Sequence, residues 1–157
     1  MSDSRNKKNE EFTFNEKEVE IAIEMQKELA PVVDMLLYML DKTHTKFTIV
    51  VIKAQYEGLY QYLLNTKRDT DILKIIDEKY GIFGIVCQDT TVDGGYMFAN
   101  RLVTTLINEQ SIKDVTCVAL EVRTNRYDVR DIVYKTFQLY TNARHRSTLG
   151  EIKYHSL

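Results

Sequence analysis

Several features that would point to a particular class of protein are scarce in this chain of 157 residues. Its two cysteines, Cys87 and Cys117, lie in apolar, strand-like runs and lack metal-ligand spacing, which predicts buried free thiols. No stretch approaches the roughly 18 apolar residues that a membrane-spanning helix needs. The first five residues are polar and lack the apolar core of a signal peptide. We therefore expect a cytoplasmic protein with no membrane span.

The chain also lacks an excess of positive charge and the common catalytic motifs. Its formal net charge is -2, whereas a nucleic-acid-binding domain normally carries a basic excess. It contains no complete G-x-G-x-x-G, no phosphate-binding loop and no nucleophile elbow. The three histidines are scattered, with no cysteine at metal-ligand spacing. We expect no nucleic-acid partner, no catalytic residue, no metal and no cofactor.

What the sequence does contain is typical of a globular domain, with 44% hydrophobic and 28% charged residues. Residues 1–15 are mostly polar and are predicted to form a flexible tail. A helix is predicted over residues 16–42, with Pro31 either bending it or starting a second helix. Residues 43–157 are predicted to form the folded domain.

The predicted N-terminal helix carries apolar residues at alternating intervals of three and four, which is the pattern of a heptad seam. This seam could pack on the helix's own domain, or it could form the interface of a homodimer. The residues of this candidate interface are Ala22, Met25, Leu29, Val32, Leu36 and Met39.

Apolar runs and amphipathic stretches alternate along the rest of the chain. This alternation predicts an α/β sandwich, with helices flanking one central sheet. Strands are expected at residues 46–54, 81–88, 115–122 and 150–154. Helices are expected at residues 55–64, 69–76, 92–107 and 128–143, so two consecutive helices would follow the first strand.

Two polar groups near helix ends have simple structural explanations. Asp93 is predicted to cap the helix at residues 92–107, and the glycines that follow it would be permissive positions. A phosphate-binding role is the alternative, but the carboxylate of Asp93 would repel a phosphate. The basic residues from Arg144 to Arg146 suit the negative end of the last helix dipole.

The chain contains the short motifs Lys79-Tyr80-Gly81, Ile85-Val86-Cys87-Gln88 and Ala99-Asn100-Arg101-Leu102. These motifs and the order of elements resemble the GGDEF domain of diguanylate cyclases. Lys79-Tyr80-Gly81 resembles the start of the family signature, and Ile85-Val86-Cys87-Gln88 resembles the strand that leaves it. Ala99-Asn100-Arg101-Leu102 resembles a motif of the next helix. The resemblance covers about residues 33–152. It implies a palm-type sheet like that of nucleotide cyclases, which has a ferredoxin-like order, and two helices after the first strand.

The chain departs from this family at the positions that carry the chemistry. A metal-binding aspartate ends the first strand in the family, whereas the matching position here is about Lys53. The signature turn is replaced by Gly81-Ile82-Phe83-Gly84 and is about two residues shorter. Phosphoryl transfer needs metal ions and fixed charges, so the resemblance implies a domain that has lost cyclase activity.

The resemblance also implies where a regulatory ligand could bind. The family's inhibitory site for cyclic di-GMP is an Arg-x-x-Asp motif shortly before the signature. Lys74 and Asp77 occupy that register, with lysine in place of the arginine, while Arg68 and Asp71 form a complete motif six residues earlier. These four residues are the candidate ligand-binding residues.

Three functions remain open from the sequence. The first is an inactive GGDEF-like regulatory or scaffold domain that acts in signalling through protein contacts, as a homodimer or as a subunit of a larger assembly. The second is a receptor for cyclic di-GMP or another nucleotide, without turnover. The third is an unrelated small α/β sensor or regulatory module, which a chain without paired helices after Ile52 would favour.

Overall fold

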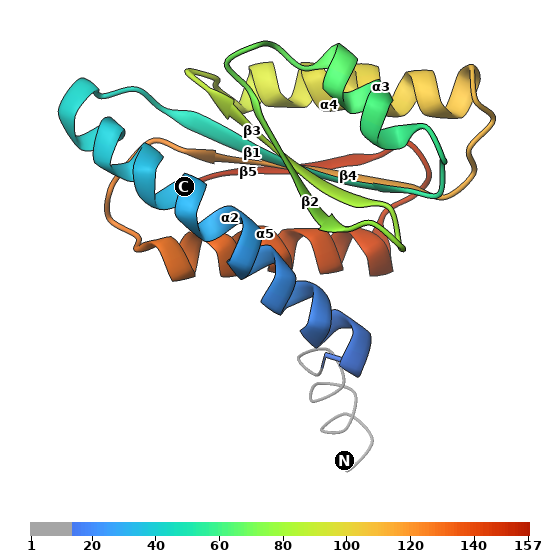
Figure 1. The fold of residues 1–157 in the computed structure, drawn as a ribbon, viewed down its shortest axis with the longest axis horizontal. Helices are drawn as coiled ribbons and strands as arrows, with labels where there is room; N and C mark the ends of the chain where they lie inside the picture. The colour runs from blue at the N-terminus through green and yellow to red at the C-terminus, as the bar shows by residue number, and fades with distance from the viewer. Residues whose placement is uncertain (1–13) are drawn as a thin grey trace.

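The computed structural model describes residues 14–157, which form four helices and five strands (Figure 1). Most of the predicted tail, residues 1–13, lies outside the described residues. Labels follow Figure 1, so the first helix is α2. The elements in chain order are α2 (Glu16–Thr43), β1 (Phe47–Ala54), α3 (Leu59–Thr66), β2 (Ile72–Asp77), β3 (Ile82–Gln88), α4 (Val92–Asn108), β4 (Val115–Val122), α5 (Val129–Arg146) and β5 (Ile152–Ser156).

The five strands form one mixed sheet in the order β2-β3-β1-β4-β5. Strand β1 lies at its centre, where it pairs antiparallel with β3 and β4, and all eight of its residues are buried. At the edges, β2 is antiparallel to β3 and β5 is parallel to β4. The unit from β1 to β4 is a ferredoxin-like β-α-β-β-α-β arrangement. The predicted α/β sandwich with an N-terminal helix is therefore confirmed.

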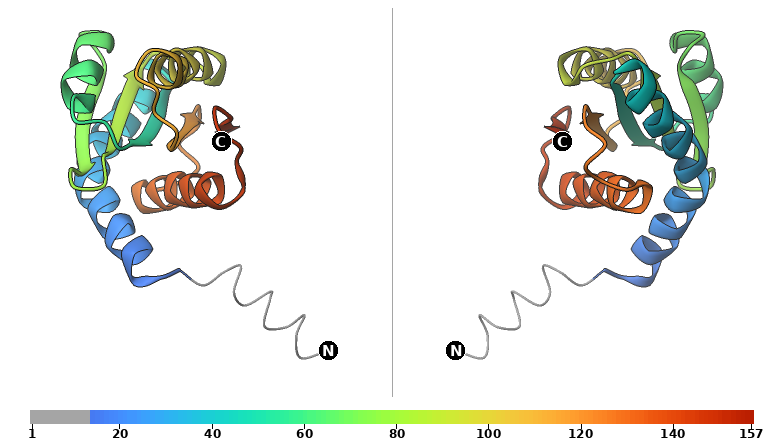
Figure 2. Two further views of the ribbon diagram at one scale, coloured as in Figure 1. Left: turned by 90° about the vertical axis from the view of Figure 1, so that its right-hand side faces the viewer. Right: turned by 90° about the vertical axis from the view of Figure 1, so that its left-hand side faces the viewer.

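Two hydrophobic cores lie on opposite faces of the sheet. Figure 1 shows α3 and α4 on one face and α2 and α5 on the other, and Figure 2 shows the same layers from both ends. Because side chains alternate along a strand, β1 contributes to both cores. Ile49 and Val51 face α2 and α5, whereas Val50 and Ile52 face α3 and α4. Across residues 14–157, no helix is both long and apolar enough to cross a lipid bilayer.

Two helices were predicted after the first strand, and the prediction of the second is wrong, because residues 72–77 form the edge strand β2. The apolar pattern of this short segment fits a helix or a strand almost equally well. Its three isoleucines favour a strand, and pairing of Ile72 to Asp77 with β3 decides between them. Only α3 separates β1 from β2.

The N-terminal helix α2 is continuous through Pro31. The apolar seam forms its inward face: Met25, Leu29 and Leu36 are buried in the core that α2 shares with α5 and the sheet. Val32 is buried there as well. Ala22 packs against this core, and Met39 is partly exposed. The seam is thus used inside the domain, so α2 would have to leave the sheet before these side chains could contact a second copy.

The N-cap of helix α4 lies two residues before the predicted cap. Thr91, not Asp93, is the N-cap, and its hydroxyl accepts a hydrogen bond from the backbone N–H of Gly94 at 3.2 Å. Asp93 lies in the first turn, where a negative charge is favourable. Gly95 then brings α4 close to β1, because a Cβ atom there would lie 2.5 Å from Cγ2 of Thr48.

Candidate functional site

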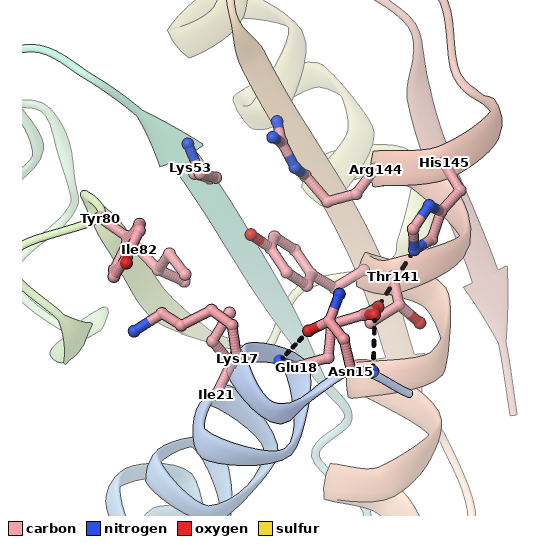
Figure 3. A pocket seen from close by; sticks show the side chains of 11 residues that line it. Asn15, Lys17, Glu18, Ile21, Lys53, Tyr80, Ile82, Thr141, Arg144 and His145 are labelled. Carbon is pink, nitrogen blue, oxygen red and sulfur yellow. Dashed lines mark hydrogen bonds and ion pairs between the residues drawn. The ribbon is translucent and has the colours of Figure 1, made fainter. Parts of the chain in front are cut away.

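A cavity of about 260 Å³ opens where α2 begins and β1 and α5 end (Figure 3). Four segments that are far apart in the sequence form its wall: the start of α2, the end of β1, the β2–β3 turn with the first residue of β3, and the end of α5. The lining residues are Asn15, Lys17, Glu18, Ile21, Lys53, Tyr80, Ile82, Tyr140, Thr141, Arg144 and His145.

The strand register places Lys53 on the floor of this pocket. Lys53 lies on the same face of β1 as Val51, which faces α2 and α5. It pairs with Ile82 on β3, and the next residue, Ala54, donates its backbone N–H to the carbonyl of Gly81 at 3.0 Å. Gly81 has a φ of 68°, and any side chain there would collide with the carbonyl oxygen of Ala54. Gly81 thus adopts a left-handed backbone conformation in the β2–β3 turn, beside the end of β1.

Lys53 and Arg144 lie near the same carboxylate, that of Asp114. Arg144 donates from Nη1 to Oδ1 of Asp114 at 2.7 Å and to the hydroxyl of Thr116 at 2.9 Å. Lys53 Nζ lies 3.7 Å from Oδ2 of Asp114. Burial and the charge of Arg144 lower the pKa of Lys53, and Asp114 only partly opposes them. The hydrogen bond from Arg144 lowers the pKa of Asp114.

Tyr140 brings a second polar group to the pocket from α5. Only 2% of this residue is exposed, yet it lines the cavity. Burial raises the pKa of its hydroxyl, so this group is a neutral hydrogen-bond donor at physiological pH. The pocket thus combines an ammonium, a guanidinium and a phenol, all of which donate hydrogen bonds.

The first turn of α2 closes the pocket through two sets of contacts. Lys17 Nζ binds Oδ2 of Asp77 at 2.8 Å and lies 3.7 Å from the centre of the Tyr80 ring. Glu18 forms a capping box with Asn15, and its Oε2 lies 3.1 Å from Nε2 of His145. Figure 3 shows these contacts of Glu18 as dashed lines. The start of α2 is therefore joined by charged contacts to β2 and to the end of α5.

Two of the four predicted ligand-binding residues, Arg68 and Asp71, bind each other outside this pocket. Arg68 Nη2 lies 2.8 Å from Oδ1 of Asp71, and the same nitrogen donates to the carbonyl of Gln88 and the hydroxyl of Thr90. Asp71 is only 4% exposed. This arginine therefore joins the turn before β2 to the end of β3, and its guanidinium already has protein acceptors.

The other two predicted residues lie further along β2. Lys74 is opposite Gly84 in the middle of the strand pair. Asp77, at the far end of β2, accepts hydrogen bonds from Lys17 and from the backbone N–H of Tyr80 at 3.0 Å. Burial raises the pKa of Asp77, but these hydrogen bonds outweigh it and leave the pKa below its usual value. Six residues of strand span roughly 20 Å, so the four residues do not form one site.

In the sequence, Lys53 drew attention only because the resembling family has an aspartate at about that position. Arg144 was interpreted only as a cation that suits the end of a helix. No role was predicted for Lys17 or Tyr140. One signal was available, because Lys53 is the only charged residue in the apolar run Phe47–Ala54. The charged neighbours of Lys53 could not be predicted, because Asp114 comes from the loop before β4 and Arg144 from α5, and they meet only in the folded chain.

Fold and pocket together define an α/β domain with a ferredoxin-like core and a donor-rich pocket beneath its N-terminal helix. Among residues 14–157 there is no group of three or more His, Cys, Asp or Glu side chains that could hold a metal ion. No protein-family model matches the chain, and no curated protein matches it in sequence.

Proposed function

We propose that this chain is a regulatory or scaffold domain, GGDEF-like in fold, that acts through contacts with other proteins and does not turn over a nucleotide. The carrying observation is the position of Lys53, the next-to-last residue of the central strand, beside the β2–β3 turn. A cyclase of this type would need a carboxylate there to hold Mg²⁺. The ammonium of Lys53 would repel the ion at this position instead.

The strand order supports the GGDEF-like part of the proposal, because β3 lies between β2 and the central strand β1. A second candidate, an unrelated small α/β regulatory module, is favoured by a different observation. Only one helix, α3, lies between β1 and β2, whereas the resemblance requires two consecutive helices after the first strand. Both candidates are regulatory domains without turnover, and they differ in ancestry.

Exposed apolar side chains on α4 and β5 support a role in protein contacts. Tyr96 and Tyr154 stack edge to face with their ring centres 5.3 Å apart, and both are more than one-third exposed. Met97, next to Tyr96, is 68% exposed. Aromatic residues and methionine are enriched at protein interfaces. A partner subunit or a second copy would bind here more readily than at the buried seam of α2.

Incubation of the purified chain with GTP and either Mg²⁺ or Mn²⁺ tests the absence of turnover. We expect no cyclic di-GMP by liquid chromatography with mass spectrometry, while an active diguanylate cyclase in the same buffer forms it. Detection of cyclic di-GMP from this chain would overturn the proposal. Calorimetric titration of the same preparation with cyclic di-GMP tests the alternative that the chain is a nucleotide receptor. If no heat of binding is measured at near-millimolar protein and ligand, that alternative is excluded.

A further inference from the structure

We propose that the pocket beneath α2 binds a small organic acid with a single negative charge, whose carboxylate contacts Lys53, Tyr140 and Arg144. This goes beyond the proposed function, because it assigns a ligand class to a site that neither the resemblance nor the motifs identified. It does not depend on whether the domain is related to GGDEF proteins.

Two nearly buried donors in the pocket are incompletely satisfied, since the Tyr140 hydroxyl has no acceptor and Lys53 has only the Asp114 carboxylate nearby. Lys53 is 8% exposed and Tyr140 is 2% exposed, and both line the cavity. Within residues 14–157, the Tyr140 hydroxyl forms no hydrogen bond, and Lys53 Nζ has only a long ion pair with Asp114, at 3.7 Å. Buried polar groups are nearly always hydrogen-bonded, because leaving one unsatisfied is costly. A carboxylate in the cavity would supply oxygen acceptors to both groups.

Arg144 provides a third group that is already fixed in position. Its two hydrogen bonds, to Asp114 and to Thr116, hold the guanidinium at the cavity wall. Figure 3 shows the side chains of Lys53 and Arg144 extending toward the same region from β1 and α5. Groups held in place before binding lose little conformational entropy when a ligand arrives.

The charges around the cavity disfavour a ligand with several negative charges. Three cationic side chains that line the cavity are matched by three carboxylates in or beside its wall. These side chains are Lys17, Lys53, Arg144, Glu18, Asp77 and Asp114. A polyphosphate would therefore meet too few uncompensated cations, whereas a monoanion needs mainly the unsatisfied donors.

The shape and lining of the cavity favour a short apolar body on the ligand. Ile21, Tyr80 and Ile82 contribute apolar surface on the side formed by α2 and the β2–β3 turn. The volume of about 260 Å³ is below the roughly 300–1,000 Å³ of pockets for drug-sized ligands. A compound the size of benzoate is therefore a suitable probe, and a cyclic dinucleotide is too large to enter.

Titration of the isotope-labelled chain with sodium benzoate at constant ionic strength, followed by amide NMR, tests the proposal. We expect saturable shifts confined to the lining residues. Acetate, which lacks the apolar body, should bind about tenfold more weakly. Lys53→Met and Tyr140→Phe should each weaken benzoate binding about tenfold or more, as expected for a lost hydrogen bond to a charged group.

Two matched substitutions serve as controls. Lys153→Met removes an ammonium from the same sheet, and Tyr134→Phe removes a hydroxyl from the same helix, but neither residue lines the pocket. Both should leave the benzoate affinity unchanged. The dispersion of the amide spectra verifies that each variant is folded.

Several results would overturn the proposal. One is an absence of saturable shifts up to about 20 mM benzoate, and another is a set of shifts spread over unrelated surfaces. A third is a benzoate affinity of Lys53→Met and of Tyr140→Phe that equals the affinity of the unsubstituted chain. Tighter binding of inorganic phosphate or GTP than of benzoate would overturn the assignment to a monoanion. Such failures leave the proposed absence of turnover intact, because that is decided by product formation from GTP.

Discussion

Substitution of Gly95 by alanine should destabilise the domain at the contact between α4 and β1. The new Cβ would lie 2.5 Å from Cγ2 of Thr48, which is fully buried. Thr48 cannot easily turn away, because its hydroxyl donates to the carbonyl of Thr90 at 2.7 Å. Overpacking of this kind costs roughly 1–3 kcal/mol, and the better helix propensity of alanine returns about 1 kcal/mol. We expect a net loss of up to about 2 kcal/mol.

Urea unfolding followed by circular dichroism measures this change in the free energy of unfolding. Gly94→Ala is the matched control, because Gly94 is the preceding residue of the same helix and its new Cβ would meet only Thr90 and Thr91, at 3.2 and 3.6 Å. We expect Gly94→Ala to be neutral or to stabilise by up to about 1 kcal/mol, since alanine is the better helix former.

A rescue variant identifies the physical cause. Thr48→Ser removes Cγ2 but keeps the hydroxyl, so the loss caused by Gly95→Ala should be much smaller in the Thr48→Ser background. The coupling energy between the two substitutions should reach about 1 kcal/mol. If Gly95→Ala were as stable as Gly94→Ala, or if the two substitutions were additive, α4 would not approach β1 as described.

Three further predictions concern other parts of the chain. Pro31→Ala should raise the free energy of unfolding by about 1–3 kcal/mol in urea titrations, because Pro31 is an exposed interior helical residue without an N–H donor; a loss of stability would contradict this. The native pKa of Asp77 is lowered, so its ion pair with Lys17 adds stability above the unfolded pKa of about 3.9. The stability deficit of Asp77→Asn should therefore be present at pH 7 and shrink as the pH falls below about 4, and a deficit independent of pH would refute the linkage. Burial raises the pKa of Cys87 to about 12 and raises that of Cys117 as well, so a disulfide reagent at pH 8 should modify both thiols only in denaturant.

Local patterns in the sequence were sufficient for most of the elements. The β-branched run around Val50 and Val51 predicted a central strand, and all eight residues of β1 are buried. The burial predicted for Cys87 and Cys117 is confirmed. These predictions hold because composition and periodicity within a single element determine whether that element can be buried.

Two predictions depended on partners distant in the chain and could not be made locally. Residues 72–77 became a strand because β3 offered them a pairing edge. The heptad pattern of α2 showed an apolar face but not what would cover it, and the fold placed the domain's own sheet and α5 there. A periodic apolar face indicates that its burial is favourable, but it does not indicate which element or chain will cover it.

The sequence by itself determined the α/β class, the amphipathic helices, the burial of β1 and the presence of a lysine near the end of that strand. Tertiary structure alone decided the strand identity of β2, the inward direction of the α2 seam and the pocket in which Lys53, Tyr140 and Arg144 meet. The physical reason is that local sequence sets the preferences of each segment. The contacts that complete a strand pair, a core or a pocket form only when segments far apart in the chain pack together.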